Sequence, residues 1–300
     1  MRLAGAIDIG GTSTKVGIVG DDGRILTRAR IATTPAGDPL PLVEAIVATL
    51  RPMLDAAGAP GNVPLGIGVS VAGFLDREHT AMVENANLPA LCGFPLRPAI
   101  EERLALDCRL EVDSNAAVAA EYLHGAGRGA ARLLGVTIGT GLGGGVIIDG
   151  ALLRHTGECA GDLGHIILDP KGPRCSCGAH GCLEALVCSA ALSRRAGGRR
   201  VREIIAGAKA GDASAGTALA ETGWWLGVGL ASLSPLFAPD RIVVGGGVAA
   251  ARELLLEPAR ASYQAHAAPE LHRKARIVGS GFDGWEGLLG AASLFLHPLP

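Results

Sequence analysis

A repeated glycine-rich hairpin is the feature that most constrains this sequence. Residues 5–23 read as an apolar strand, the loop Gly10-Gly11-Thr12, a second strand and an Asp22-Gly23 turn. Residues 134–150 repeat this plan around a loop at 139–145 and end on another Asp-Gly turn. Because Asp-Gly turns favour tight hairpins, each glycine loop joins two strands and does not lead from a strand into a helix. This arrangement excludes the usual Walker and Rossmann phosphate loops.

The glycine loops suit a polyanion. Glycine lets the backbone approach phosphate closely, and the loop N–H groups and the hydroxyls of Thr12 and Thr140 can donate to phosphate oxygens. Two such loops facing each other would clamp one nucleotide. A third glycine run, Gly245-Gly246-Gly247, follows a strand at 241–244 and precedes a helical segment at 248–256. Its glycines could admit a flat ring, and simple helix–strand packing explains them equally well.

One imidazole and three thiols converge between residues 165 and 182. His165, Cys175, Cys177 and Cys182 have the spacing of a metal site, and three thiolates with one imidazole suit zinc. Four protein ligands leave no open position for an activated water, so the zinc would be structural. His180 is a competing fourth ligand, and a coincidence of polar residues in a glycine-rich loop is the alternative.

Composition narrows the class of protein. A chain of 300 residues favours two domains, and 48% hydrophobic residues supply ample material for burial. The net charge of −2 arises from charges in mixed order, which gives no reason to expect nucleic acid or a membrane as a partner. No apolar stretch reaches the length of a membrane span, and seven cysteines, an odd number, fit a reducing compartment. We therefore expect a cytoplasmic protein.

An acidic residue stands where a strand meets a helix. A strand at 109–112 ends at Asp113-Ser114-Asn115, before the alanine-rich helix 116–123. A carboxylate in this position is either a helix cap or a catalytic base, and the local sequence by itself favours the cap.

Together these motifs resemble the ROK family of bacterial sugar kinases, within the actin-like, sugar kinase and heat-shock ATPase superfamily. The resemblance spans nearly the whole chain, and the cysteine motif is its most specific part. It rests on Asp8-Ile9-Gly10-Gly11-Thr12, Asn87-Leu88-Pro89, Asp113-Ser114-Asn115-Ala116-Ala117, Gly139-Thr140-Gly141, Ala160-Gly161-Asp162-Leu163-Gly164-His165, the run from Cys175 to Glu184, and Gly245-Gly246-Gly247.

The resemblance implies two α/β domains of the actin-like ATPase fold that close on a cleft for a sugar and Mg-ATP. The smaller domain would comprise 1–112 with about 285–300, and the larger 113–284. Asp113 would take the proton from a hexose 6-hydroxyl, and Asp8 would help to position the magnesium and the transferring phosphate. The residues implied to bind ATP and its phosphates are Asp8, Gly10, Gly11, Thr12, Lys15, Gly139, Thr140, Gly141, Gly245, Gly246 and Gly247. The sugar contacts implied are Gly73, Asn87, Asp113, Asp162, His165 and Glu184, with His165 serving sugar and zinc through its two ring nitrogens.

Three departures from the family pattern bear on the sugar. Val112 stands where the family has Asn, Asp162 where it has Glu, and Ala72 where it has Pro. We therefore predict an ATP-dependent kinase for the 6-hydroxyl of a hexose or aminohexose, with kanosamine or an N-acylhexosamine favoured over glucose. The alternatives are an ordinary glucokinase and a sugar sensor without catalysis. The resemblance also implies a homodimer or a dimer of dimers.

Overall fold

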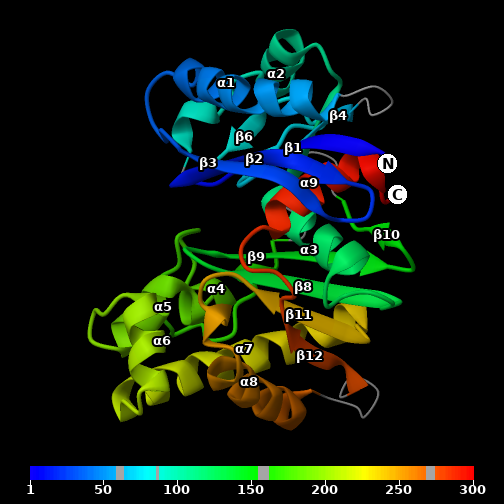
Figure 1. Ribbon diagram of the computed structural model, residues 1–300. Helices are drawn as coiled ribbons and strands as arrows, with labels where there is room; N and C mark the ends of the chain where they lie inside the picture. The colour runs from blue at the N-terminus through cyan, green and yellow to red at the C-terminus, as the bar shows by residue number, and fades with distance from the viewer. Residues whose placement is uncertain (59–63, 86–87, 155–161, 268–273) are drawn as a thin grey trace. The chain divides into compact units, whose positions relative to one another are not determined.

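The computed structural model describes residues 1–58, 64–85, 88–154, 162–267 and 274–300 (Figure 1). Within these ranges the two larger sheets are mixed and flanked by helices, as the resemblance implies, and β5 and β6 form a small antiparallel sheet. No helix in the described part of the chain is long and apolar enough to cross a membrane.

The contacts among residues divide the chain into two compact units. The first comprises Met1–His124, Ala151–Ala160 and Trp285–Pro300, and the second comprises Gly125–Gly150 and Gly161–Gly284. The C-terminal segment thus joins the N-terminal part of the chain. The units also group 113–124 with the first segment, whereas the resemblance implies a second domain that begins at residue 113.

The first unit is built on the sheet β3-β2-β1-β4-β7, in which β2 runs antiparallel to both of its neighbours and β1, β4 and β7 are parallel. Helices α1 and α2 cover one face, and α9 with α3 covers the other (Figure 1). Its elements are β1 (Leu3–Ile9), β2 (Ser13–Gly20), β3 (Ile25–Ala32), α1 (Leu40–Ala57), β4 (Pro64–Val71), β5 (Phe74–Leu75), β6 (Met82–Glu84), the 3₁₀ helix η1 (Pro89–Leu91), α2 (Leu96–Leu104), β7 (Cys108–Val112), α3 (Asp113–His124), β10 (Ala151–Leu152) and α9 (Glu286–Leu296).

The burial pattern of the strands explains this layering. All seven residues of β1 are buried, as expected for a central strand covered on both faces. By contrast, β3 alternates between half-buried and exposed residues, as expected for an edge strand with one face in water. The candidate site residues at the ends of β1 and β4 are therefore positioned by the most deeply buried strands of the unit.

The second unit contains the sheet order β9-β8-β11-β12. Its core joins apolar residues of these strands to those of the long helix α7 and of α8. Its elements are β8 (Arg132–Ile138), β9 (Leu142–Ile148), the 3₁₀ helix η2 (Leu163–His165), α4 (Leu183–Val187), α5 (Ser189–Arg195), α6 (Val201–Lys209), α7 (Ala213–Phe237), β11 (Arg241–Gly245), the 3₁₀ helix η3 (Ala249–Ala251), α8 (Glu253–His266) and β12 (Arg276–Gly279).

Both glycine loops join antiparallel strands, as the repeated hairpin predicts. The second loop is shorter than expected, because β9 begins at Leu142 and includes the glycines at 143–145. Gly144 among them serves packing, since a Cβ there would lie 2.7 Å from Leu163 Cδ1. The helical segment predicted at 248–256 is likewise interrupted, because Arg252 has a φ of 53° between η3 and α8.

Two glycines let α7 and α8 pack closely. A Cβ on Gly223 would collide with the carbonyl oxygen of Leu255, and one on Gly227 would collide with that of Ala259 and lie 2.6 Å from Ser262 Cβ. The two backbones therefore approach closely at positions four residues apart, on one face of α7.

We predict that Gly227→Ala lowers the free energy of unfolding by about 1–3 kcal/mol, the usual cost of overpacking a filled contact. Gly216→Ala is the matched control in the same helix, because nothing lies within 4 Å of its added Cβ. It should raise stability by up to about 1 kcal/mol, since alanine is the better helix former. Urea unfolding followed by circular dichroism measures both. Equal stability of the two variants would show that the α7–α8 contact is loose.

Candidate functional site

Asp8 is held by two polar neighbours near the end of β1. Its Oδ2 accepts a hydrogen bond from Lys15 Nζ at 2.7 Å, and its Oδ1 accepts one from Ser70 Oγ at 3.0 Å. The sheet register explains both contacts, because Asp8 pairs with Lys15 on β2 and with Ser70 on β4. Gly287 in α9 leaves room for the carboxylate, since a Cβ there would lie 2.5 Å from Asp8 Cγ. This buried charge therefore has the cation and the hydroxyl that it requires.

Asp113 is the first residue of α3, directly after β7. Its Oδ1 accepts a hydrogen bond from the backbone N–H of Ser114 at 2.7 Å. Desolvation by the surrounding protein, followed by the nearby Asp8 carboxylate, raises the pKa of Asp113 to about 6. The residue keeps an exposed surface, so the shift reflects reduced hydration of the charged form and not full enclosure. A carboxyl group tuned toward neutral pH suits a general base.

A buried ion pair lies two residues before Asp113. Glu111 has a side chain that is 2% exposed, and its Oε2 accepts a hydrogen bond from Arg154 Nε at 2.7 Å. Its Oε1 accepts from the backbone N–H of Val112 and from the Asn115 side chain. The guanidinium also donates to the Leu299 carbonyl at 2.9 Å. One carboxylate thus ties the start of α3 to residue 154 and to the C-terminal residues.

Each glycine loop is closed by its own backbone. In the first, Gly10 N–H donates to the Ser13 carbonyl at 3.2 Å. In the second, Gly139 N–H donates to the Gly141 carbonyl at 2.9 Å, and Ser189 Oγ donates to the Gly139 carbonyl at 2.6 Å. The side chains of Thr12 and Thr140 are exposed at these loops, where their hydroxyls are open to a ligand.

Four side chains of the second unit form a group that could hold a metal ion. The ligand atoms of His165, Cys175, Cys177 and Cys182 all lie within 4.8 Å of one another. Cys175 Sγ is 3.4 Å from His165 Nδ1, and Cys177 Sγ is 3.7 Å from Cys182 Sγ. Burial, with the neighbouring thiols, raises the pKa of the Cys182 thiol to about 12. A metal ion is what would hold such a thiol as thiolate.

His180 does not belong to this group. Its Nδ1 donates to the Gly172 carbonyl at 3.1 Å, which closes the loop with an isolated bridge between Arg174 and His180. The alternative of His180 as fourth ligand therefore has no support from the geometry.

Glu184 connects the metal group to the second glycine loop. Its Oε1 accepts from Ser176 Oγ at 2.7 Å, and its Oε2 accepts from the Leu142 N–H at 3.0 Å. Gly141 carries no side chain because a Cβ there would lie 2.6 Å from Glu184 Oε2. The carboxylate of Asp162 lies 3.3 Å from His165 Nε2, on the ring nitrogen that faces away from Cys175.

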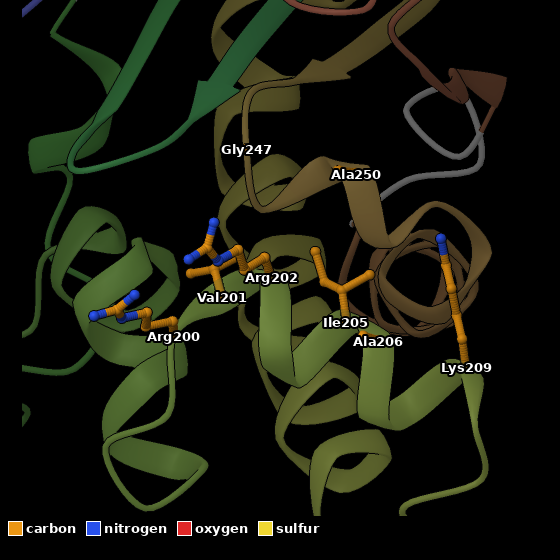
Figure 2. A pocket seen from close by; sticks show the side chains of 8 residues that line it. All are labelled: Arg200, Val201, Arg202, Ile205, Ala206, Lys209, Gly247 and Ala250. Atoms are coloured by element: carbon orange, nitrogen blue, oxygen red, sulfur yellow. The ribbon is translucent and has the colours of Figure 1, made fainter. Parts of the chain in front are cut away.

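The third glycine run borders a pocket of about 760 Å³ (Figure 2). Gly247 and Ala250 form one side, and the residues of α6 form the other. Gly246 has a φ of 88°, and its added Cβ would collide with Ile138. This glycine therefore allows the loop after β11 to pass against the end of β8.

The predicted site residues divide between the two units. Asp8, Lys15, Gly10, Gly11, Thr12 and Asp113 belong to the first unit, and Asp162, His165, Glu184 and the second and third glycine runs belong to the second. Gly73 has a φ of 106°, a value that explains the glycine, and a Cβ there would lie 2.6 Å from the Glu84 carbonyl oxygen. Asn87 lies outside the described residues.

Sequence reasoning missed Glu111 and Arg154. The available signal was an acidic residue inside the apolar strand Leu110-Glu111-Val112, which needs a buried partner. It also missed Glu286, the first residue of α9, whose pKa is raised by burial and on which the charges of Lys15 and Asp8 act.

Two α/β units, each with a glycine hairpin, define an actin-like ATPase fold, and comparison with known proteins agrees. The sequence matches the ROK family over residues 4–297. The chain belongs to this family.

Relatives match along the full length of the chain. It is 32% identical to a glucokinase of Streptomyces coelicolor, over 100% of this chain and 99% of the relative. It is 30% identical to an N-acetylmannosamine kinase of Citrobacter koseri, over 96% of this chain and 97% of the relative. A crystal structure of a ROK family glucokinase from Streptomyces griseus, in complex with glucose and AMPPNP, is similar with a TM-score of 0.83. It is 33% identical, and the match covers 98% of this chain and 99% of that one.

We predict that Glu111→Gln lowers the free energy of unfolding by roughly 2 kcal/mol or more, because it leaves the Arg154 guanidinium without its carboxylate. Glu44→Gln is the matched control, since Arg103 contacts Glu44 at the same 2.7 Å distance but the Glu44 side chain is 60% exposed. It should cost less than about 1 kcal/mol. Urea unfolding measures both. Equal losses in the free energy of unfolding would mean that the buried Glu111–Arg154 pair stabilises the protein no more than the exposed pair does.

Proposed function

We propose that this chain transfers the γ-phosphoryl group of ATP to the 6-hydroxyl of a hexose or aminohexose. Its family and its full-length relatives make it a sugar kinase. The acceptor position, the residues that act on it and the identity of the sugar are the proposed part.

One observation carries the proposal: Asp113 and Asp8 share one unit, and the charge of Asp8 contributes to raising the pKa of Asp113 to about 6. In the proposed reaction Asp113 accepts the proton of the sugar 6-hydroxyl while the oxygen of that hydroxyl attacks the γ-phosphorus. The bond from that phosphorus to the bridging oxygen breaks, and ADP leaves. The glycine loops and Lys15 contribute alignment and charge neutralisation, which phosphoryl transfer chiefly needs.

The donor side of the site follows from the same residues. Gly10, Gly11, Thr12, Gly139, Thr140 and Gly141 would hold the phosphates, and the pocket beside Gly247 would receive the base. The carboxylate of Asp8 offers the oxygen ligands that magnesium prefers, with a second lone pair left on each oxygen. Magnesium bound with ATP would neutralise charge on the phosphate oxygens.

We also propose that His165, Cys175, Cys177 and Cys182 bind a structural zinc ion. A zinc–sulfur bond of about 2.3 Å in a tetrahedron implies sulfur atoms about 3.8 Å apart. The 3.7 Å between Cys177 Sγ and Cys182 Sγ fits this geometry, and His165 Nδ1 lies 3.4 Å from Cys175 Sγ. The ion would hold the loop that carries Ser176 and lies against Glu184.

The sugar would contact Gly73, Asn87, Asp162, His165 and Glu184. Val112 would lie beside the general base, Asp113. A glucose hydroxyl that meets an apolar valine remains unpaired, which costs about 1–3 kcal/mol. The carboxylates of Asp162 and Glu184 could instead favour an amine. These residues support an aminohexose such as kanosamine, or an N-acylhexosamine. An ordinary glucokinase is the second candidate, because a full-length relative carries that name.

We predict that Asp113→Asn loses at least about 10²-fold in kcat while sugar binding is retained, since a general base contributes that much or more. Because the reactive form is the carboxylate, kcat/KM of the native enzyme should fall tenfold per pH unit below about pH 6 and level off above it. The raised pKa means that charging Asp113 opposes folding, so the variant should be no less stable at pH 8. Normal turnover with a lower melting temperature would make Asp113 only a helix cap.

We predict about one zinc ion per chain in purified protein, measured by elemental analysis. Cys182→Ser should lose the metal and leave the remaining thiols titratable, whereas Cys92→Ser, a half-buried cysteine of the other unit, should keep it. Less than about half a zinc per chain in the native protein, with freely titratable thiols, would contradict the assignment.

We predict that an aminohexose or N-acylhexosamine has the highest kcat/KM with Mg-ATP, in a panel of glucose, mannose, glucosamine, N-acetylglucosamine, N-acetylmannosamine and kanosamine. Val112→Asn should raise kcat/KM for glucose by roughly ten- to a hundredfold, because the amide supplies the hydrogen-bond partner that the glucose hydroxyl lacks beside valine. If glucose is best by tenfold and Val112→Asn changes nothing, the protein is an ordinary glucokinase. If no sugar releases ADP, it is a sensor.

A further inference from the structure

The pocket beside Gly247 has an unusual distribution of polar groups. Its walls are apolar at Val201, Ile205, Ala206 and Ala250. Arg202, Ile205 and Lys209 lie three and four residues apart on α6, so they occupy one face of that helix. Figure 2 shows Arg202 and Lys209 toward opposite ends of the pocket, with Ile205 between them.

Every polar side chain that lines this pocket is a cation. The described residues around it contribute Arg200, Arg202 and Lys209 but no carboxylate, amide or hydroxyl. Arginine and lysine side chains only donate hydrogen bonds. A ligand in the pocket therefore meets side-chain donors and no side-chain acceptor.

These cations are also not neutralised by a neighbour. Within the described ranges, no acidic side chain forms an ion pair with Arg200, Arg202 or Lys209. Glu203 on the same helix accepts from the backbone N–H of Arg200 at 3.1 Å and does not line the pocket. The guanidinium of Arg202 is thus available to a ligand.

Purine bases differ in what they present to such donors. Adenine carries an amino group at C6, a donor that finds no side-chain partner here, beside the acceptor N7. Guanine and hypoxanthine carry the acceptors O6 and N7 side by side, a pattern that a planar guanidinium can bind with two hydrogen bonds. The apolar walls accept any flat ring and discriminate weakly.

We infer that the base pocket admits 6-oxopurine nucleotides, GTP and ITP, as phosphoryl donors about as well as ATP, with Arg202 reading O6 and N7. The inference rests on the proposed function, in which this pocket receives the base of the donor. It names Arg202 as the residue that sets donor specificity.

The test has two readouts. The first is kcat/KM for ATP, GTP and ITP with the best sugar, and the second is calorimetric titration of the native protein with ADP, GDP and IDP in the presence of magnesium. We expect GTP and ITP to lie within about tenfold of ATP. Arg202→Gln should raise the ratio of kcat/KM for ATP to kcat/KM for ITP by at least about tenfold. A glutamine amide both donates and accepts hydrogen bonds, so it can pair with the N6 amino group and N7 of adenine.

Two further variants complete the design. Arg202→Met keeps the length of the side chain but removes its donors, and it should weaken GDP and IDP more than ADP. Lys274→Met, an exposed lysine of the same unit outside the pocket, should leave every ratio unchanged.

The outcomes separate the two proposals. A preference for ATP over ITP of more than a hundredfold, or an unchanged ratio in both Arg202 variants, overturns the inference. Failure of every nucleotide to phosphorylate a sugar defeats the proposed function, while the diphosphate titrations still decide the base preference. If none of the diphosphates binds, the inference fails as well.

Discussion

The convergence of one imidazole and three thiols is the constraint on which the second unit's candidate site depends. The four ligand atoms lie within 4.8 Å of one another, where η2 meets the loop that ends at Cys182. Glu184 follows two residues later and binds both Ser176 and the first N–H of β9. The position of the second glycine loop is thus linked, through one carboxylate, to the geometry of the metal group.

In the first unit, the candidate site depends on how each of three carboxylates replaces the water that burial removes. Asp8 is buried but has a cation and a hydroxyl as partners, and Glu111 is buried with Arg154. Asp113 accepts a hydrogen bond from the backbone N–H of Ser114, and the nearby charge of Asp8 disfavours its charged form. Asp8 and Glu111 thus have partners for their charged forms, whereas the charged form of Asp113 is less well stabilised, which is the condition for a base near neutral pH.

Local sequence predicted the elements that depend on neighbouring residues. The Asp149-Gly150 turn has positive φ at both residues, as its sequence requires, and the strands on either side of each glycine loop pair as expected. The spacing of His165, Cys175, Cys177 and Cys182 also predicted their convergence, because loop ligands of a metal group lie close in sequence. The predicted extent of the second loop was wrong, since the glycines at 143–145 belong to β9, where Gly144 packs against Leu163.

What the sequence by itself determined is thus the family, which is recognised from motifs along the whole chain, together with the two glycine hairpins and the His–Cys group. The hairpins and the His–Cys group rest on contacts between residues near in the chain. Only the tertiary structure decided that Ser70 contacts Asp8, that Arg154 pairs with Glu111, and that α6 lines a pocket with Gly247. These contacts join segments far apart in sequence. Their partners are set by sheet register and helix packing, which no local pattern of residues records.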